Sequence, residues 1–298
     1  MSETVPAATA PGLWEITIVR VGTRSTSRSD VYLNYPLYHQ ADGPIDMDYF
    51  FWVLRSPEET ILVDTSFSRH GGESRGRTVL LEPADAFRLA GVEPGSAPRI
   101  IVTHGHYDHI GNLSLFPDAQ ITMSRTEFDF WTGPHADKPL FAHSVEADEI
   151  EHLRQAADRG NVTFISGTAD VAPGIRLLEI GGHTPGQCIL FVETSEGTVL
   201  LASDAVHYYE EYEQDIVFTS VSDLVEMYDS FALIRQWEAD GTVDLVVSGH
   251  DPSTLGRFTP ATGALEGLAA TIGTATPGDT TTAEDTTTAV TTTEGVHS

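Results

Sequence analysis

Three histidines and one aspartate lie within six positions of the segment "IIVTHGHYDHIGN", residues 100–112. His104 and His106 are two positions apart, so in extended chain their side chains point the same way and can converge on one point. Asp108 and His109 follow where the chain must turn, and they can face a second point nearby. Imidazole and carboxylate groups are ligands of zinc, iron, manganese and cobalt. This loop therefore offers ligands to two metal ions, which in hydrolytic pairs lie roughly 3.5–4 Å apart.

Three further segments place a histidine or an aspartate after an apolar run. They are "LLEIGGHTPGQ" with His183, "TVLLASDAVHYY" with Asp204 and "VDLVVSGHDP" with His250. Residues 99–102, before the first cluster, have the same character, and short apolar β-branched runs are typical of buried strands. One histidine after a strand is weak evidence, but four strand ends with His or Asp in the same role are hard to obtain by chance. We therefore expect all of them to serve one metal centre.

The order of these motifs, THxHxDHxG, GHTPG, SDA and GHD, resembles the metallo-β-lactamase superfamily. Spacing and flanking residues are most similar to its N-acyl homoserine lactonase branch, over about residues 14–258. The resemblance implies an α/β fold, an αββα four-layer sandwich with the metal ions at one edge of its two sheets. It also implies that Asp64, in "ETILVDTS", supports the ligand loop. The implied ligands are His104, His106 and His183 for one ion, Asp108, His109 and His250 for the other, and Asp204 as the bridge between them.

The chemistry that such a site implies is hydrolysis. The expected cofactors are two divalent metal ions, zinc first, with iron, manganese or cobalt as alternatives because the ligand set suits all four. A water shared by two dications loses a proton near neutral pH, since coordination lowers its pKa from about 15.7 to about 7. We therefore expect a hydrolase that opens a lactone, or cleaves a related ester, with a hydroxide bridging two metal ions. Asp108 is expected to carry the proton to the leaving oxygen.

Position 207 departs from the lactonase pattern. Lactonases of this branch commonly carry tyrosine three residues after the bridging aspartate, and here His207 occupies that position, followed by Tyr208. An imidazole can also donate a hydrogen bond to a developing oxyanion. We therefore take His207 as a catalytic candidate, with Tyr208 as the competing one. The departure leaves the physiological substrate and its acyl group open.

Single residues and the net charge disfavour several other members of the superfamily. β-Lactamases of the main subclass use cysteine where this chain has Asp204, and the one cysteine, Cys188, lies in the strand-like "QCILFVE". Flavin-linked di-iron members usually carry glutamate where His106 stands. Glyoxalase II enzymes need basic residues for glutathione, and Lys138 is the only lysine. With 16 Lys and Arg against 44 Asp and Glu, the net charge of −28 excludes nucleic acid as a partner and favours a small-molecule substrate.

Two other functions stay open at this point. The first is a dinuclear metallohydrolase of a catabolic pathway that acts on an amide, an aromatic lactone or a phosphoester, although few basic residues are available to hold a phosphate. The second is a non-catalytic metal-binding protein on the same fold, against which the complete ligand set argues. A turnover screen on lactones of varied ring and chain length would separate these possibilities.

One domain with two extensions is expected. Residues 1–12 are expected to be a flexible N-terminus, residues 13–270 the hydrolase domain and the threonine-rich residues 271–298 a disordered tail. No secretory signal and no apolar run of about 18 residues is found in the sequence, so we expect a cytoplasmic protein without membrane contact. The sequence leaves the oligomeric state open.

Two segments are expected to shape the substrate pocket. Residues 125–160 read as a short helix, a break around Gly133 and Pro139, and a second helix from about residue 145 to 157, and we expect them to form a lid over the metals. In the aromatic-rich stretch before the first ligand strand, Tyr35, Tyr38 and Met47 lie in loop-like chain and are candidates for the pocket wall.

Overall fold

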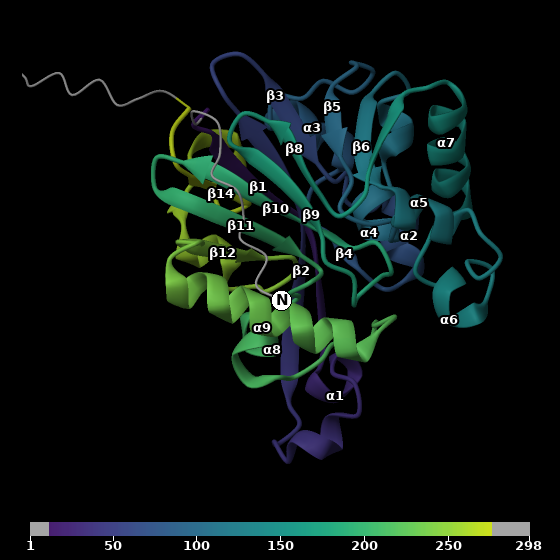
Figure 1. Cartoon of the computed structure of the whole chain (residues 1–298), viewed down its shortest axis with the longest axis vertical. Coiled ribbons are helices and arrows are strands. Elements are labelled where there is room, and N and C mark those ends of the chain that lie inside the picture. Colours follow the sequence, from purple (N-terminus) through teal and green to yellow (C-terminus); the bar gives the residue numbers. More distant parts are fainter. Residues whose placement is uncertain (1–11, 276–298) are drawn as a thin grey trace, which may run out of the picture.

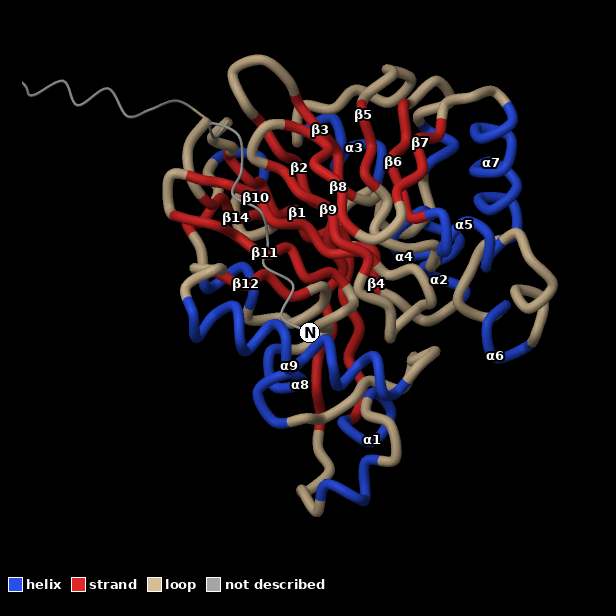
Figure 2. The backbone as a smooth tube through the Cα atoms, in the orientation of Figure 1, coloured by secondary structure: helices blue, strands red, loops and turns tan. Residues whose placement is uncertain are grey.

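The computed structural model describes residues 12–275, and in this range two β-sheets stack face to face between outer layers of helices (Figure 1, Figure 2). The described helices are α1 (Arg28–Val31), α2 (Arg69–Ser74), α3 (Pro83–Leu89), α4 (Tyr107–Ile110), α5 (Arg125–Trp131), α6 (Pro139–Ala142), α7 (Ala147–Asp158), α8 (Tyr209–Gln214) and α9 (Leu224–Asp240). Single 3₁₀ turns occur at η1 (Tyr35–Tyr38) and η2 (Leu113–Leu115) and, after α9, at η3 (Thr254–Arg257) and η4 (Gly263–Leu265).

The larger sheet has nine strands within the described residues, in the order β13-β14-β1-β2-β3-β5-β6-β7, with β4 paired to β1. Its strands are β1 (Glu15–Ser27), β2 (Pro44–Arg55), β3 (Thr60–Val63), β4 (Thr78–Val79), β5 (Arg99–Ile101), β6 (Gln120–Ser124), β7 (Val162–Ile165), β13 (Thr259–Pro260) and β14 (Ala269–Ile272). From β3 to β7 the strands run parallel, so their carboxyl ends share one edge.

The smaller sheet has the order β12-β11-β10-β9-β8. Its strands are β8 (Thr168–Ala172), β9 (Ile175–Glu179), β10 (Cys188–Thr194), β11 (Gly197–Ser203) and β12 (Leu245–Ser248). Strands β11 and β12 pair in parallel, which brings their carboxyl ends together. The other neighbours in this sheet are antiparallel.

Three apolar clusters show why the layers form. Strand β2 is apolar on both faces, and successive side chains of a strand point to opposite sides of the sheet. Trp52 faces the interior between the two sheets, where the apolar side chains of β10 meet it. Phe51 faces the opposite side and packs against Phe87 of α3, with 4.6 Å between ring centroids. On the far face of the smaller sheet, Phe191 contacts Trp237 of α9. These layers confirm the predicted αββα sandwich.

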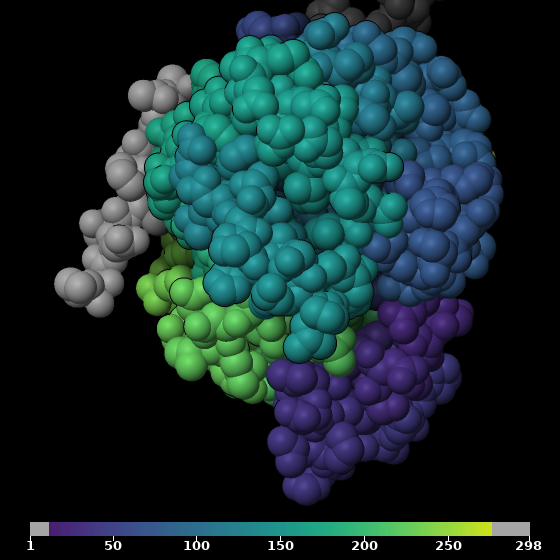
Figure 3. Space-filling model, turned by 90° about the vertical axis from the view of Figure 1, so that its right-hand side faces the viewer, coloured from purple at the N-terminus to yellow at the C-terminus, as the bar shows by residue number. Residues whose placement is uncertain are grey.

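The hairpin of β1 and β2 extends beyond the body of the sandwich and ends in α1 and η1. Figure 3 shows this purple end projecting next to the green α8–α9 region. Arg28 of α1 forms a 2.8 Å ion pair with Glu210 of α8, and the Tyr32 hydroxyl donates a hydrogen bond to the same carboxylate. These contacts fix the projecting end against α8, the helix that follows β11.

The chain boundaries and the lid segment can be compared with the expectations. The helix predicted from about residue 145 to 157 is confirmed as α7, and α5 confirms the short helix before it. The predicted boundary after residue 270 is two residues too early, because β14 pairs Ile272 with Ile16 and buries it between the sheets. One apolar residue among threonines was too weak a pattern to reveal this. Residues 1–11 and 276–298, including most of both predicted extensions, lie outside the described residues.

No helix in the described part of the chain has the length and apolar character that crossing a membrane requires.

Candidate metal centre

The seven predicted ligands meet at one edge of the sandwich, at the carboxyl ends of strands from both sheets. The first four follow β5 and the others follow β9, β11 and β12, and the parallel pairing of β11 with β12 brings the loops of Asp204 and His250 together. Every one of these residues is buried, with at most 7% of its surface exposed. They are His104, His106, Asp108, His109, His183, Asp204 and His250.

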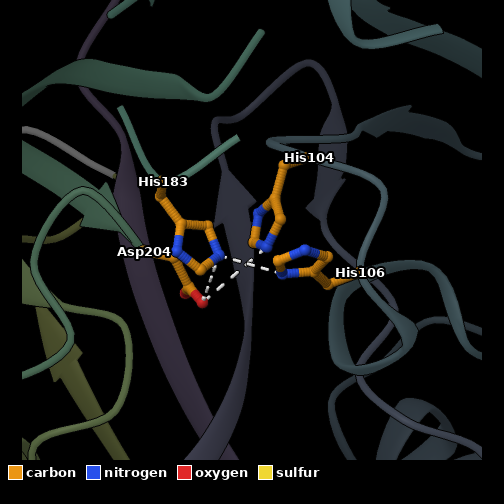
Figure 4. Close-up of side chains that lie close together, drawn as sticks. All are labelled: His104, His106, His183 and Asp204. Carbon is orange, nitrogen blue, oxygen red and sulfur yellow. Dashed lines mark hydrogen bonds and ion pairs between the residues drawn. The ribbon is translucent and has the colours of Figure 1, made fainter. Parts of the chain in front are cut away.

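The first group is formed by His104, His106, His183 and Asp204, whose potential ligand atoms all lie within 4.8 Å of one another. Figure 4 shows the three imidazoles and the carboxylate pointing toward one shared space. His183 Nε2 is 2.9 Å from His106 Nδ1 and 3.4 Å from Asp204 Oδ2. His104 Nε2 is 3.7 Å from the same carboxylate oxygen. Nitrogen and oxygen donors therefore converge from three separate loops.

The second group is formed by Asp108, His109 and His250, again within 4.8 Å of one another. Here the other oxygen of Asp204 is the shared neighbour. Asp204 Oδ1 lies 3.1 Å from His109 Nε2 and 3.1 Å from His250 Nε2. The two oxygens of one carboxylate thus face the two groups, which is the geometry expected of a bridging ligand.

Hydrogen bonds on the outer side of the cluster orient the imidazoles. His109 Nδ1 lies 2.7 Å from Asp64 Oδ2, His250 Nδ1 lies 2.7 Å from the carbonyl oxygen of Asp48, and His183 Nδ1 lies 2.8 Å from that of Ser220. A proton on each Nδ1, donated to these oxygens, leaves the Nε2 lone pair directed into the cluster. In that tautomer each of these rings could bind a metal ion through Nε2.

Asp64 also anchors the ligand loop itself. Its carboxylate accepts hydrogen bonds from the backbone N–H of Thr103, at 2.8 Å, and from the Thr103 hydroxyl, at 2.7 Å. Asp64 is fully buried, and its own backbone has a φ of 59°, in the left-handed region. The position supports the role that sequence resemblance implied for this residue.

Unpartnered polar atoms show that these residues fit metal ions. Within residues 12–275, His104 Nε2, His109 Nε2 and Asp204 Oδ1 are buried without any hydrogen-bond partner. A buried polar group left without a partner costs about 1–3 kcal/mol. Burial also lowers the pKa of His104 and of His106 well below the usual value, which keeps their nitrogen lone pairs free. Divalent ions would satisfy these donors.

The structure brings His207 to the cluster. Its Nε2 lies 3.2 Å from Asp204 Oδ2, and on the other side of the ring Nδ1 lies 3.3 Å from Glu211 Oε2. Burial alone would lower the pKa of His207, but the carboxylates of Glu211 and Asp204 raise it to about 9. Phe218 stacks on the ring at 3.8 Å, and His207 is fully buried. It therefore lies next to the Asp204 carboxylate.

Tyr208, the competing candidate, lies elsewhere. Its ring packs edge-on against Tyr32, 5.7 Å between centroids, within the apolar cluster of the larger sheet. Its hydroxyl has no hydrogen-bond partner in the described part of the chain, so it bonds to none of the predicted ligands. Of the two candidates, His207 is the one that contacts the cluster.

Glu127 is a residue of the site that sequence reasoning missed. Its carboxylate accepts hydrogen bonds from the backbone N–H of Gly105, at 2.8 Å, and from that of Gly186, at 3.0 Å. It therefore ties the loop of His104 and His106 to the loop of His183. The sequence signal was ambiguous, because Ser124 and Glu127 have the spacing of a helix capping box, which usually lies at the surface.

Two cavities lead to the cluster, and both are lined by His106 and His183. One, of about 320 Å³ and named here the apolar cavity, has an aromatic wall formed by Phe130, Trp131 and Phe141. The expected lid segment therefore lines a route to the cluster. The cavity also takes in residues 219–222, which precede α9.

The other cavity, of about 280 Å³, is lined by Met47, as expected for the pocket wall, and by Arg24, Arg75 and Arg77. Tyr35 and Tyr38 do not line either of these two cavities. Tyr35 is buried against Tyr32, and the Tyr38 hydroxyl accepts a hydrogen bond from the backbone N–H of Val217 at 3.1 Å. Sequence reasoning did not find the arginines, because only the fold brings them to this opening.

Comparison with known proteins places the chain. The sequence model described as "Metallo-beta-lactamase superfamily" matches residues 48–250. An N-acyl homoserine lactonase of Bacillus thuringiensis is 28% identical over 189 residues, which are 58% of this chain and 70% of that protein. Metallo-beta-lactamase domain-containing protein 1 of Xenopus laevis is 30% identical over 217 residues, 72% of each chain. The crystal structure of a quorum-quenching N-acyl homoserine lactone lactonase has the same fold, with a TM-score of 0.66, 24% identity, and coverage of 80% of this chain and 92% of that one.

Proposed function

Because the chain belongs to the metallo-β-lactamase superfamily, we propose that it is a metal-dependent hydrolase that opens a lactone ring or cleaves a related carboxylic ester. The observation that carries the proposal is the Asp204 carboxylate, whose two oxygens face two separate groups of metal-ligating side chains. The similarity to proteins named N-acyl homoserine lactonase supports the choice of a lactone.

The donor set suits two divalent ions. His104, His106 and His183 would hold one ion, and Asp108, His109 and His250 the other, with Asp204 between them. Zinc is the first choice for nitrogen and oxygen donors, with iron, manganese and cobalt as alternatives. When bound, such a pair supplies a hydroxide nucleophile at neutral pH and polarises the substrate carbonyl.

Asp108 is the group placed to move a proton. Its carboxylate lines the arginine-containing cavity and lies 3.8 Å from His250 Nε2. A carboxyl group at the floor of a substrate cavity can pass a proton to the alkoxide that leaves when the ring opens. No serine or cysteine nucleophile is needed, and Cys188 is buried inside β10.

His207 is proposed to act through Asp204. The ring lines neither cavity, and Phe218 stacks on one of its faces, so direct contact with a substrate would need Phe218 to move. Its Nε2 instead faces the Asp204 carboxylate. Glu211 accepts a 3.0 Å hydrogen bond from the His207 backbone N–H and so holds the residue in place. In this role His207 fixes the position of Asp204.

A turnover screen tests the proposed function. Metal-loaded protein is offered lactones of varied ring size and acyl length, together with open esters, amides and phosphoesters, and product is measured directly. We expect the highest kcat/KM on a lactone or ester. The Asp204→Asn variant serves as the control for contaminating hydrolases. Turnover confined to phosphoesters or amides, or none on any substrate by fully loaded protein, would overturn the proposal.

A further inference from the structure

Two arginines at the mouth of the second cavity have no acidic partner. Arg24 donates a 3.1 Å hydrogen bond to the Thr26 hydroxyl, and Arg77 donates to the Tyr107 hydroxyl at 2.9 Å. Within residues 12–275, neither guanidinium forms an ion pair, whereas the neighbouring Arg75 is paired with Glu146. In a chain with 44 acidic and 16 basic residues, a cation without an acid partner is unexpected.

Strand pairing brings these two cations to one wall of the cavity. Strand β4 pairs antiparallel with β1 through Gly22 with Val79 and Thr23 with Thr78. Arg24 and Arg77 are the next residues at the same end of this pairing, and both line the cavity. Two like charges on one cavity wall repel each other. An anion bound between the two guanidinium groups would reduce this repulsion.

The surroundings leave the two positive charges uncompensated. Arg77 lies over the rings of Tyr49 and Tyr107, at 5.5 and 6.0 Å from their centroids. An aromatic face attracts a cation but carries no net negative charge that would neutralise it. The Asp108 carboxylate shares the cavity, but it belongs to the predicted metal-ligand group. An anionic ligand would therefore supply the negative charge that this wall of the cavity lacks.

The two arginines lie in the same cavity as several of the predicted metal ligands. Arg24 and Arg77 line the same cavity of about 280 Å³ as His106, Asp108 and Asp204. The apolar cavity adjoins this one, because His106, His183 and Ser144 line both. A molecule that spans both would have an apolar arm at one end and an anionic group at the other.

We propose that Arg24 and Arg77 bind a carboxylate of the substrate, so that the physiological substrate is an anionic lactone or ester with an apolar arm. This inference rests on the proposed hydrolase function and names its substrate class. A guanidinium group offers two parallel N–H donors in one plane, which match the two oxygens of a carboxylate. Such charge-assisted hydrogen bonds are roughly twice as strong as neutral ones.

The test compares matched substrates. An acyl ester that ends in a carboxylate, and the same ester with that carboxylate replaced by a neutral carboxamide, are offered to wild type, Arg24→Gln and Arg77→Gln. We expect wild type to prefer the anionic ester. Each substitution is expected to lower the ratio of kcat/KM, anionic over neutral, by about 10-fold, mainly through KM, because it removes a charge-assisted hydrogen bond to the carboxylate. Arg77→Lys, which keeps the charge, should restore part of the ratio.

Arg159→Gln is the matched control, because Arg159 is exposed, bonds only to the carbonyl oxygen of Pro117 at 3.1 Å, and lines neither cavity. If Arg24→Gln and Arg77→Gln change both esters by the same factor, the carboxylate site is wrong while the hydrolase function stands. An ester that carries a phosphate in place of the carboxylate is measured as well. If the two arginines affect the hydrolysis of that ester but not of the carboxylate ester, the carboxylate site is also wrong. Failure of the wild type on every ester and lactone would instead reject the proposed function.

Discussion

The metal-ligand cluster and the two cavities that lead to it are built in different ways. The cluster is assembled from residues that directly follow strands, and outer hydrogen bonds such as those of Asp64 fix its side chains. The cavity walls share some of these ligands but also include residues from other segments, among them the β1–β4 pair and the α5–α6 region. We therefore expect the chemistry and the choice of substrate to depend on largely different parts of the chain. Substitutions in the cluster should therefore affect every substrate, and substitutions in the walls only some.

The largest effect outside the ligands themselves is expected at Asp64. In Asp64→Asn, one carboxylate oxygen becomes an NH₂ donor, which cannot accept the hydrogen bonds that Thr103 and His109 now direct at both oxygens. We expect metal affinity to fall about 100-fold, the upper end for loss of an outer partner of a ligand. Metal competition with a chromophoric chelator measures this.

Cys188→Ser is the control for that substitution. Cys188 is also fully buried, but it lies in β10 and its thiol contacts only the carbonyl oxygen of Gly186, at 3.4 Å. We expect unchanged metal affinity and a modest loss of stability from the buried hydroxyl. Equal losses of affinity in both variants would mean that any disturbance of the core releases metal, and the specific role of Asp64 would be rejected.

A smaller effect is expected at His207. Because its ring supports Asp204, His207→Ala should lower kcat about 10- to 100-fold on all substrates and weaken metal binding as well. Tyr208→Phe should change neither quantity, since the Tyr208 hydroxyl has no partner among the described residues. Steady-state kinetics and metal titration on the two variants check this. Loss of kcat in His207→Ala at unchanged metal affinity would indicate a direct hydrogen bond to the substrate instead.

The candidate ligands could be predicted from the sequence, and so could part of the cavity walls, namely Met47 and the lid segment, but the arginines could not. His183 and His250 each follow an apolar run, so the local pattern already places them at strand ends. Arg24 and Arg77 meet only because the two-residue strand β4 pairs with β1, a contact between distant parts of the chain that leaves no periodic signal. Glu127 was hidden for a related reason, since its helix-start pattern does not reveal that the helix is packed onto the ligand loops.

The smallest effect is expected in the apolar wall. Phe141 packs edge-on against Phe130, 5.0 Å between centroids, and both line the apolar cavity. Phe141→Ala should raise KM about 10-fold for substrates with a long acyl arm and much less for short ones, because the loss is one of apolar contact. A chain-length series of esters measures the difference. A fall in kcat that is the same for all chain lengths would contradict the expectation that substitutions in the cavity walls affect only some substrates.

The central claim is that the buried cluster holds two metal ions joined by Asp204. Elemental analysis of protein purified without chelators tests it most directly, with wild type and Asp204→Asn measured side by side. We expect about two divalent transition-metal ions per wild-type chain. In Asp204→Asn both sites lose their shared ligand, and we expect the metal content to fall well below that value together with turnover. A fully active wild type with one ion per chain, or an Asp204→Asn variant that keeps two ions and full activity, would contradict the account.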